Sequence, residues 1–209
     1  MKNYLSILFI ILVCTFSCKR KENNDISQHI IIDTLDKLVP TDSNSLYFPD
    51  SLDNFRNQWY SKQLFAMREP IISKDTSRIE IYRFTWLRTF HNPISVRIER
   101  QSNCYLLSWK QCNGAGGYEP KDLIISQQKI IDQNIWYTFV SKIKNIEFWN
   151  LPSVVDFDGK DGAQWILEGK ASNRYHFTDR WSDASKEYID CCKFLLEQAN
   201  LSIDTNKIY

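Results

Sequence analysis

Charged and titratable side chains recur at positions where neighbouring β-strands could bring them onto one surface. Apolar and polar residues alternate in Ile94-Ser95-Val96-Arg97-Ile98-Glu99-Arg100, so a strand there would turn Arg97 and Glu99 away from its apolar side. An arginine guanidinium is a rigid fork that suits carboxylate or phosphate groups. We predict a polar groove on that open side for a small anionic or glycan-like ligand, with Trp86 or Trp181 at its edge. Its candidate residues are Arg83, Arg97, Lys110, Glu168, His176 and Arg180.

The alternatives to this groove are a salt-bridged solvent face that binds nothing, and a catalytic site. If Glu168 and His176 face the same side of a hairpin, they form a pair suited to general acid-base catalysis by a small hydrolase. The sequence contains no Gly-x-Ser-x-Gly nucleophile motif, however, and its histidines are His29, His91 and His176. A binding domain without catalytic residues is therefore the leading interpretation.

Motifs for metals, phosphates and cofactors are incomplete. The segment 156–162 resembles a calcium-binding loop, but Lys160 occupies the third ligand position and Leu167 replaces the closing glutamate. Gly114-Ala115-Gly116-Gly117 lacks the Lys-Ser/Thr pair of a phosphate-binding loop. The cysteines and histidines do not follow the spacing of a zinc site. We expect no metal and no cofactor, and we interpret both segments as turns.

Four cysteines lie in the part of the chain that we expect to fold. Cys104 and Cys112 are eight strand residues apart, about 26 Å if extended, which is too far for a disulfide. Cys191 and Cys192 diverge by about 100° on a helix. A bond from that helix to Cys104 or Cys112 stays open, and buried free thiols are the alternative.

Hydrophobic periodicity predicts an α+β fold, with an antiparallel sheet of about five strands and helices packed on one face. Helices are expected at 51–66, from Asp132 to about 147, and after Ser182 or Asp183. Strands are expected at 78–87, 94–100, 105–112, 163–168 and 174–180. The short connections between the first three strands indicate an antiparallel meander.

Length and charge limit the class of protein. A chain of 209 residues fits one ordinary domain with a tail, and we place that domain at 46–209. Its 26 Lys and Arg residues nearly balance 25 Asp and Glu residues. No overall positive field attracts nucleic acid, so we expect no nucleic-acid partner.

The N-terminal segment has the features of an export signal. Lys2 precedes a mostly apolar run from Leu5 to Phe16, and this run is shorter than the roughly 20 residues of a membrane-spanning helix. Thr15-Phe16-Ser17-Cys18 resembles the lipobox of bacterial lipoproteins, whose cysteine is acylated and becomes the mature N-terminus. The resemblance implies a signal peptide at 1–17, lipidation of Cys18 and a tether at 18–45. A plain secretory signal and a short uncleaved anchor are the alternatives.

This resemblance implies a location in the cell envelope, with attachment to a bacterial membrane through the lipid on Cys18. A second segment, from Asp161-Gly162 to Arg180-Trp181-Ser182, resembles exported bacterial proteins of unknown function and implies no activity. The sequence therefore predicts a lipid-anchored envelope protein that binds an unknown protein or a small anionic or glycan ligand. A small envelope hydrolase is the alternative.

Overall fold

The computed structural model describes residues 35–156, 159, 161–201 and 203, so Cys18, the predicted signal peptide and most of the predicted tether lie outside this part. Its helices are α2 (Asn54–Ala66), α3 (Gln133–Asn145) and α4 (Lys186–Gln198), with short 3-10 helices η1 (Asp36–Leu38), η2 (Ile72–Lys74) and η3 (Phe148–Asn150). No helix of the described residues has the length and apolar character needed to cross a membrane.

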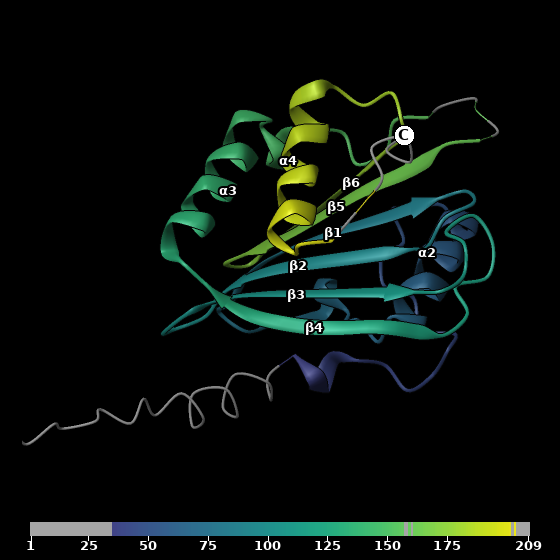
Figure 1. Cartoon of the computed structure of the whole chain (residues 1–209), viewed down its shortest axis with the longest axis horizontal. Helices are drawn as coiled ribbons and strands as arrows, with labels where there is room; N and C mark the ends of the chain where they lie inside the picture. The colour runs from purple at the N-terminus through teal and green to yellow at the C-terminus, as the bar shows by residue number, and fades with distance from the viewer. Residues whose placement is uncertain (1–34, 157–158, 160, 202, 204–209) are drawn as a thin grey trace, which may run out of the picture.

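Six strands form one antiparallel sheet in the order β4-β3-β2-β1-β5-β6 (Figure 1). They are β1 (Glu80–Arg88), β2 (Ile94–Arg100), β3 (Tyr105–Cys112), β4 (Leu123–Ile131), β5 (Ala163–Ala171) and β6 (Arg174–Arg180). The α+β class and the antiparallel sheet confirm the sequence prediction, which expected about five strands. The strand that we did not predict is β4, where three exposed polar residues, 126–128, interrupt the hydrophobic pattern at the sheet edge.

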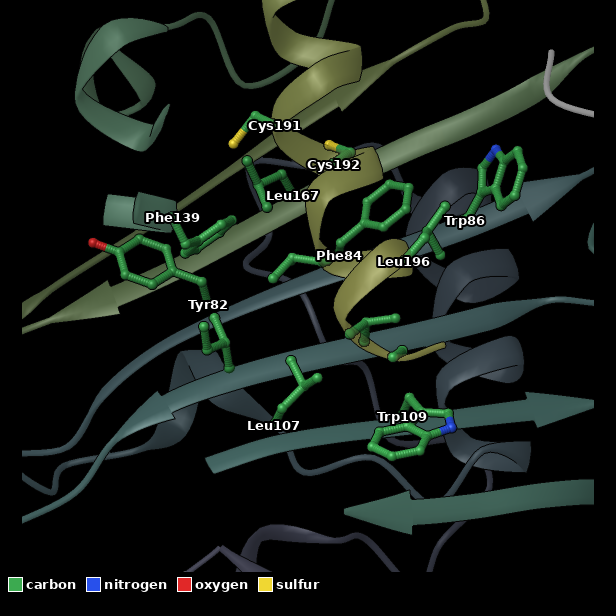
Figure 2. Close-up of a cluster of buried hydrophobic side chains, with 14 of the residues drawn as sticks. Tyr82, Phe84, Trp86, Leu107, Trp109, Phe139, Leu167, Cys191, Cys192 and Leu196 are labelled. Atoms are coloured by element: carbon green, nitrogen blue, oxygen red, sulfur yellow. The ribbon is translucent and has the colours of Figure 1, made fainter. Parts of the chain in front are cut away.

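One face of the sheet packs against α3 and α4 (Figures 1 and 2). Phe84 of β1 stacks on Trp165 of β5, with ring centroids 5.4 Å apart. Trp86 extends the same buried cluster, to which α4 contributes Cys192 and Leu196. Burial of large aromatic side chains is the main stabilising contribution of this face, at about 25 cal/mol per Å² of apolar surface.

The opposite face is covered by α2, whereas we expected the helices on one face only. Tyr60 and Leu64 of α2 belong to a buried cluster with Leu87, Ile166 and Phe177 of the sheet. The physical reason is that the central strands carry apolar side chains on both faces, and each apolar face must be removed from water.

The folded domain also begins earlier than the predicted boundary at residue 46. Leu35 is buried against Ile72 and Ile81, and the Ile71 N–H donates a hydrogen bond to the Leu38 carbonyl. The last part of the expected tether therefore packs on the α2 side of the domain.

Side-chain caps fix where the helices begin. Asp132 caps α3 as predicted, and its carboxylate accepts a hydrogen bond from the Asn134 N–H at 2.7 Å. Asp53 caps α2, and Ser185 caps α4. Both of these lie two or more residues after the caps that we expected, because several Ser and Asp residues precede each helix.

The end of α2 directs the chain back to the sheet. Arg68 adopts a left-handed conformation with φ of 52°, and the Glu69 N–H donates to the Leu64 carbonyl at 3.0 Å. This turn places the Glu69 side chain against the sheet, where it is buried.

The four described cysteines are free thiols. Cys112 is buried on the α2 side of the sheet, whereas Cys191 and Cys192 are buried on the α4 side. The sheet lies between them, so a disulfide from α4 to Cys112 is excluded. Burial raises the pKa of Cys191 to about 12, as expected for a thiol that serves packing.

Candidate functional site

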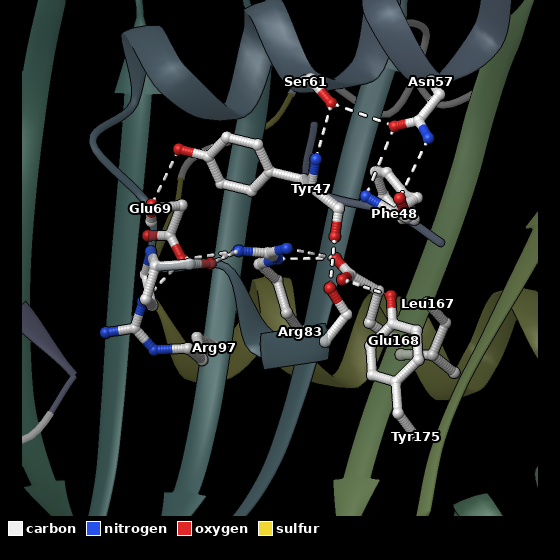
Figure 3. A network of polar contacts seen from close by, with 12 residues as sticks. Tyr47, Phe48, Asn57, Ser61, Glu69, Arg83, Arg97, Leu167, Glu168 and Tyr175 are labelled. Carbon is white, nitrogen blue, oxygen red and sulfur yellow. Dashed lines mark hydrogen bonds and ion pairs between the residues drawn. The ribbon is translucent and has the colours of Figure 1, made fainter. Parts of the chain in front are cut away.

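Four of the predicted ligand-binding residues meet between the sheet and the turn after α2 (Figure 3). Arg83 and Arg97 lie directly opposite each other on β1 and β2, an arrangement of like charges that is destabilising unless it is compensated. Glu69 supplies the compensation: its Oε2 lies 2.6 Å from Arg97 Nη1 and 3.5 Å from Arg83 Nη1. Its Oε1 lies 3.2 Å from Lys110 Nζ.

Two further carboxylates complete this group. Glu99 accepts a hydrogen bond from Arg97 Nε at 2.7 Å, and Glu168 accepts one from Arg83 Nε at 2.7 Å. Arg83 Nη2 lies 2.6 Å from the same Glu168 oxygen, without hydrogen-bond alignment. We call these six residues the buried charge network: Glu69, Arg83, Arg97, Glu99, Lys110 and Glu168. Three cations face three carboxylates, so its formal charge is balanced.

The electrostatics of the network follow from burial and pairing. Burial alone would raise the pKa of Glu69, but Arg97, Lys110 and Arg83 outweigh it and lower the pKa to about 2. Burial raises the pKa of Glu168 in spite of Arg83 and a 2.8 Å hydrogen bond from the Tyr175 hydroxyl. Glu69 is therefore the carboxylate that the cations hold ionised.

The network is not the open groove that we predicted. Arg83 and Glu168 are both 0% exposed, and α2 with the segment after it covers the face on which they lie. Trp86 is buried on the α4 side of the sheet. Arg83, Arg97 and Lys110 share one face of the sheet, as predicted, but that face is an interior surface. We conclude that the network attaches the end of α2 to the sheet.

His176 and Arg180 lie on the opposite face, which corrects the prediction that they join the other four. A two-residue turn, Ser172-Asn173, connects β5 and β6, and the resulting register pairs His176 with Gly169. His176 packs against the Phe148 and Trp149 rings, at centroid distances of 5.1 and 6.4 Å.

Arg180 also has a structural environment. Its Nη1 and Nη2 donate to the carbonyls of Asp179 and Pro152 at 2.8 and 2.6 Å. Glu168 pairs with Phe177 and points to the α2 face, so it and His176 are separated by the sheet. The proposed acid-base pair of a hydrolase is therefore wrong.

A surface cleft of about 670 Å³ lies at the N-terminal end of α2. One wall is the start of α2, and the other walls are formed by Gly117 and Tyr118 of the glycine-rich loop and by Val155, Asp156 and Gly159. The ends of β5 and β6 form its floor. We call it the aromatic cleft, after Phe55, Trp59, Tyr118 and Trp181, which line it together with polar residues.

Two aromatic side chains at the rim are largely exposed: Phe55 is 74% and Tyr118 is 60% exposed. Hydrogen bonds from α2 hold the Tyr118 loop in place. Trp59 Nε1 donates to the Gly116 carbonyl at 2.8 Å, and Gln63 Nε2 donates to the Tyr118 carbonyl at 2.8 Å. A Cβ on Gly116 would lie 2.7 Å from the backbone of β1, so only glycine permits this close approach. The rim is thus fixed by the fold.

Trp181 is positioned by a second close contact. A Cβ on Gly162 would lie 2.5 Å from the Trp181 ring, so the absence of a side chain there lets the ring lie against the backbone. The Thr89 hydroxyl donates to the Gly162 carbonyl at 3.0 Å and fixes this backbone. Trp181 therefore lines this cleft, which is not the groove at whose edge we predicted it.

One arginine and three carboxylates give the cleft its polar character. Arg56 Nη2 lies 2.9 Å from an Asp156 oxygen, and Arg56 Nε lies 3.6 Å from Asp53 and 4.0 Å from Asp179. With three carboxylates and one guanidinium, the formal charge of this group is −2 when all are ionised. The cleft is therefore mildly acidic.

Asp179 is the buried member of this group, at 3% exposure. Its Oδ2 accepts a hydrogen bond from the Tyr60 hydroxyl at 2.7 Å, whereas Oδ1 has no hydrogen-bond partner among the described residues. Burial raises its pKa to about 6, although the Tyr60 hydrogen bond and Arg56 act in the opposite direction.

This pKa predicts how the Asp179→Asn variant differs from the wild type. The unfolded carboxyl titrates near 3.8 and the folded one near 6, so the folded state binds more protons between these values. The free energy of unfolding of the wild type therefore falls as pH rises through this window, by about 3 kcal/mol. The Asp179→Asn variant lacks this fall, because its amide does not titrate. Urea unfolding at pH 4 and pH 7 measures this change in the free energy of unfolding for both proteins. An equal change in the two proteins would contradict the raised pKa of Asp179.

The sequence contained only partial signals for the cleft. It indicated the glycine-rich loop, the Asp-rich turn and Trp181, each for a different reason, but nothing in the spacing connects them with Arg56 or Asp179. These residues meet because β6 ends beside the first turns of α2, a tertiary contact shown by the Tyr60–Asp179 hydrogen bond.

In the described part of the chain, no group of three or more His, Cys, Asp and Glu residues has the arrangement of a metal site. Neither a scan against protein-family models nor a search of curated proteins finds a match for this chain.

Proposed function

We propose that the chain is a lipid-anchored cell-envelope protein whose α+β domain binds a ligand in the aromatic cleft, without catalysis of its own. The observation that carries the binding function is the cleft itself. Its volume of about 670 Å³ falls within the range of small-ligand sites, which is about 300–1,000 Å³.

The rigidity of the rim supports this proposal. When the backbone that carries an exposed aromatic side chain is already held in place, binding does not have to order that backbone. Phe55 and Tyr118 meet this description, because one lies on a capped helix and the other on a loop held by Gln63. Both exposed rings line the same cleft, and exposed apolar side chains gathered at one place are typical of binding sites.

The anchor rests on the leader sequence. The short apolar run and the lipobox-like residues before Cys18 support lipidation there, and acyl chains contribute about 0.8 kcal/mol of membrane affinity per buried methylene. The partner of the N-terminus is then a bacterial membrane, and the partner of the domain is the ligand in the cleft.

Thermal unfolding tests the binding function. A small-molecule extract of the bacterial envelope, if it holds the ligand at about 100 times its Kd, stabilises the wild type by about 2.7 kcal/mol. The Phe55→Ala, Tyr118→Ala double variant should fold normally, because both rings are exposed. The extract should stabilise this variant much less than it stabilises the wild type. Tyr137→Ala is the matched control, since Tyr137 is exposed on α3, away from the cleft. Equal stabilisation of all three proteins, or of none, would contradict the proposal.

A further inference from the structure

We infer that the ligand of the aromatic cleft is a neutral glycan, with sugar rings against the aromatic rim and hydroxyl groups on the polar floor. This inference rests on the proposed function and specifies its ligand class. The evidence comes from the charge of the cleft, from its hydrogen-bonding groups and from the position of its aromatic rings.

The charge of the cleft disfavours an anionic ligand. Asp53, Asp156 and Asp179 surround a single Arg56, so an anion would meet excess negative charge. The cations that first suggested an anionic ligand are used elsewhere. Arg83 and Arg97 are paired with carboxylates inside the buried charge network, on the sheet side of α2.

A cationic ligand is disfavoured for a different reason. Arg56 lies 2.9 Å from Asp156 and within 4.0 Å of Asp53 and Asp179, so a cationic ligand that approached these carboxylates would meet this guanidinium. A second cation would have to displace this guanidinium or lie beside it. A neutral ligand avoids both costs.

The polar groups of the cleft suit hydroxyl groups in particular. Arg56 has N–H donors, Asp156 has acceptors, and Gln164 has one group of each kind. A hydroxyl both donates and accepts, so a ligand with several hydroxyls can satisfy donors and acceptors on the same floor. Tyr60 shows this chemistry within the protein, since its hydroxyl already donates to Asp179 at 2.7 Å.

The aromatic rings occupy two walls of the cleft. Phe55 and Trp59 of α2 line one wall, with ring centroids 6.2 Å apart, and Tyr118 of the glycine-rich loop lines another. Sugar rings have a face of C–H groups that packs against aromatic rings while the hydroxyls at the ring edge stay hydrated or hydrogen-bonded. Aromatic side chains on both walls around a polar floor match this amphipathic shape.

Calorimetric titration of the full chain with oligosaccharides that share a backbone and differ in charge tests the inference. The probes are N-acetylchitohexaose and mannohexaose, which are neutral, and the cationic chitosan hexamer and anionic hexamannuronate, which have the corresponding backbones. Neutral hexaoses of glucose with α-1,4, β-1,4 and β-1,3 linkages extend the set. We expect at least one neutral hexaose to bind, and at least about tenfold more tightly than its charged counterpart. Tyr118→Ala should weaken that binding at least about tenfold, and Tyr137→Ala should leave it unchanged.

Three outcomes would overturn the inference: no neutral hexaose binds, a charged hexamer binds more tightly than its neutral counterpart, or Tyr118→Ala has no effect on the neutral ligand. If a charged hexamer binds more tightly than its neutral counterpart and Tyr118→Ala weakens it, the inferred neutral charge of the ligand is wrong but the binding function of the cleft stands. If no probe binds and the envelope extract also fails to stabilise the wild type, the proposed function itself is contradicted.

Discussion

Replacing Glu69 by glutamine is expected to lower the free energy of unfolding by about 3 kcal/mol, a large loss for a single charge change. Glu69 is the carboxylate that Arg97, Lys110 and Arg83 share. Without its charge, Arg83 and Arg97 remain opposite each other on β1 and β2 in a buried place. Removing one partner of a buried ion pair typically costs about 3–5 kcal/mol, because the remaining charge has lost its compensation.

Chemical denaturation of the wild type and the Glu69→Gln variant at neutral pH measures this loss. Glu119→Gln is the control, since Glu119 forms an exposed ion pair with Lys62 and such pairs contribute at most about 1 kcal/mol. A loss at Glu69 that is no larger than the loss at Glu119 would show that the network does not attach α2 to the sheet.

The pH dependence gives an independent check of the same prediction. The pKa of Glu69 is lowered from 4.5 to about 2, so the unfolded state binds more protons than the folded state between these values. The wild type therefore has this stability above pH 4.5 and loses about 3 kcal/mol of it as pH falls towards 2. The Glu69→Gln variant should lack this part of the acid destabilisation. Identical acid unfolding curves for the variant and the wild type would contradict the lowered pKa of Glu69.

Cys18→Ala should abolish lipid attachment completely, the second large effect that we expect. In bacteria grown with radiolabelled palmitate, the wild type should incorporate label and sediment with membranes. The Cys18→Ala variant should do neither in its processed form, because acylation requires the thiol. Cys14→Ala is a matched control within the same leader, since Val13 before it is not the small residue that a lipobox requires. Equal labelling of the Cys18→Ala variant and the wild type would refute the anchor.

Most of the fold was predictable because its elements carry strong local signals. The alternation in 94–100 predicted β2, and the Asp132 cap followed by an apolar stripe predicted α3. The strand β4 was not predicted, because this edge strand exposes polar side chains in its middle and lacks a clear alternation. Whether a further strand extends the edge of a sheet therefore depends on its pairing with the neighbouring strand, which local periodicity does not show.

The candidate site was predictable only in pieces. Arg83, Arg97 and Lys110 were correctly assigned to one face, since alternation fixes which side chains share a side. Their burial could not be predicted, because it depends on α2. Alternation within the strands does not show which face of the sheet this earlier helix covers. The relation between Glu168 and His176 depended on the length of the β5–β6 turn, and a shift of one residue exchanges the two faces.

Photocrosslinking in living bacteria tests whether the aromatic cleft is the binding surface of an envelope protein. A photoreactive phenylalanine analogue at position 118 is compared with the same analogue at position 137 in the full chain. We predict adducts with an envelope component from position 118, at least about tenfold more than from position 137. Equal adducts from both positions, or none from position 118, would contradict the account.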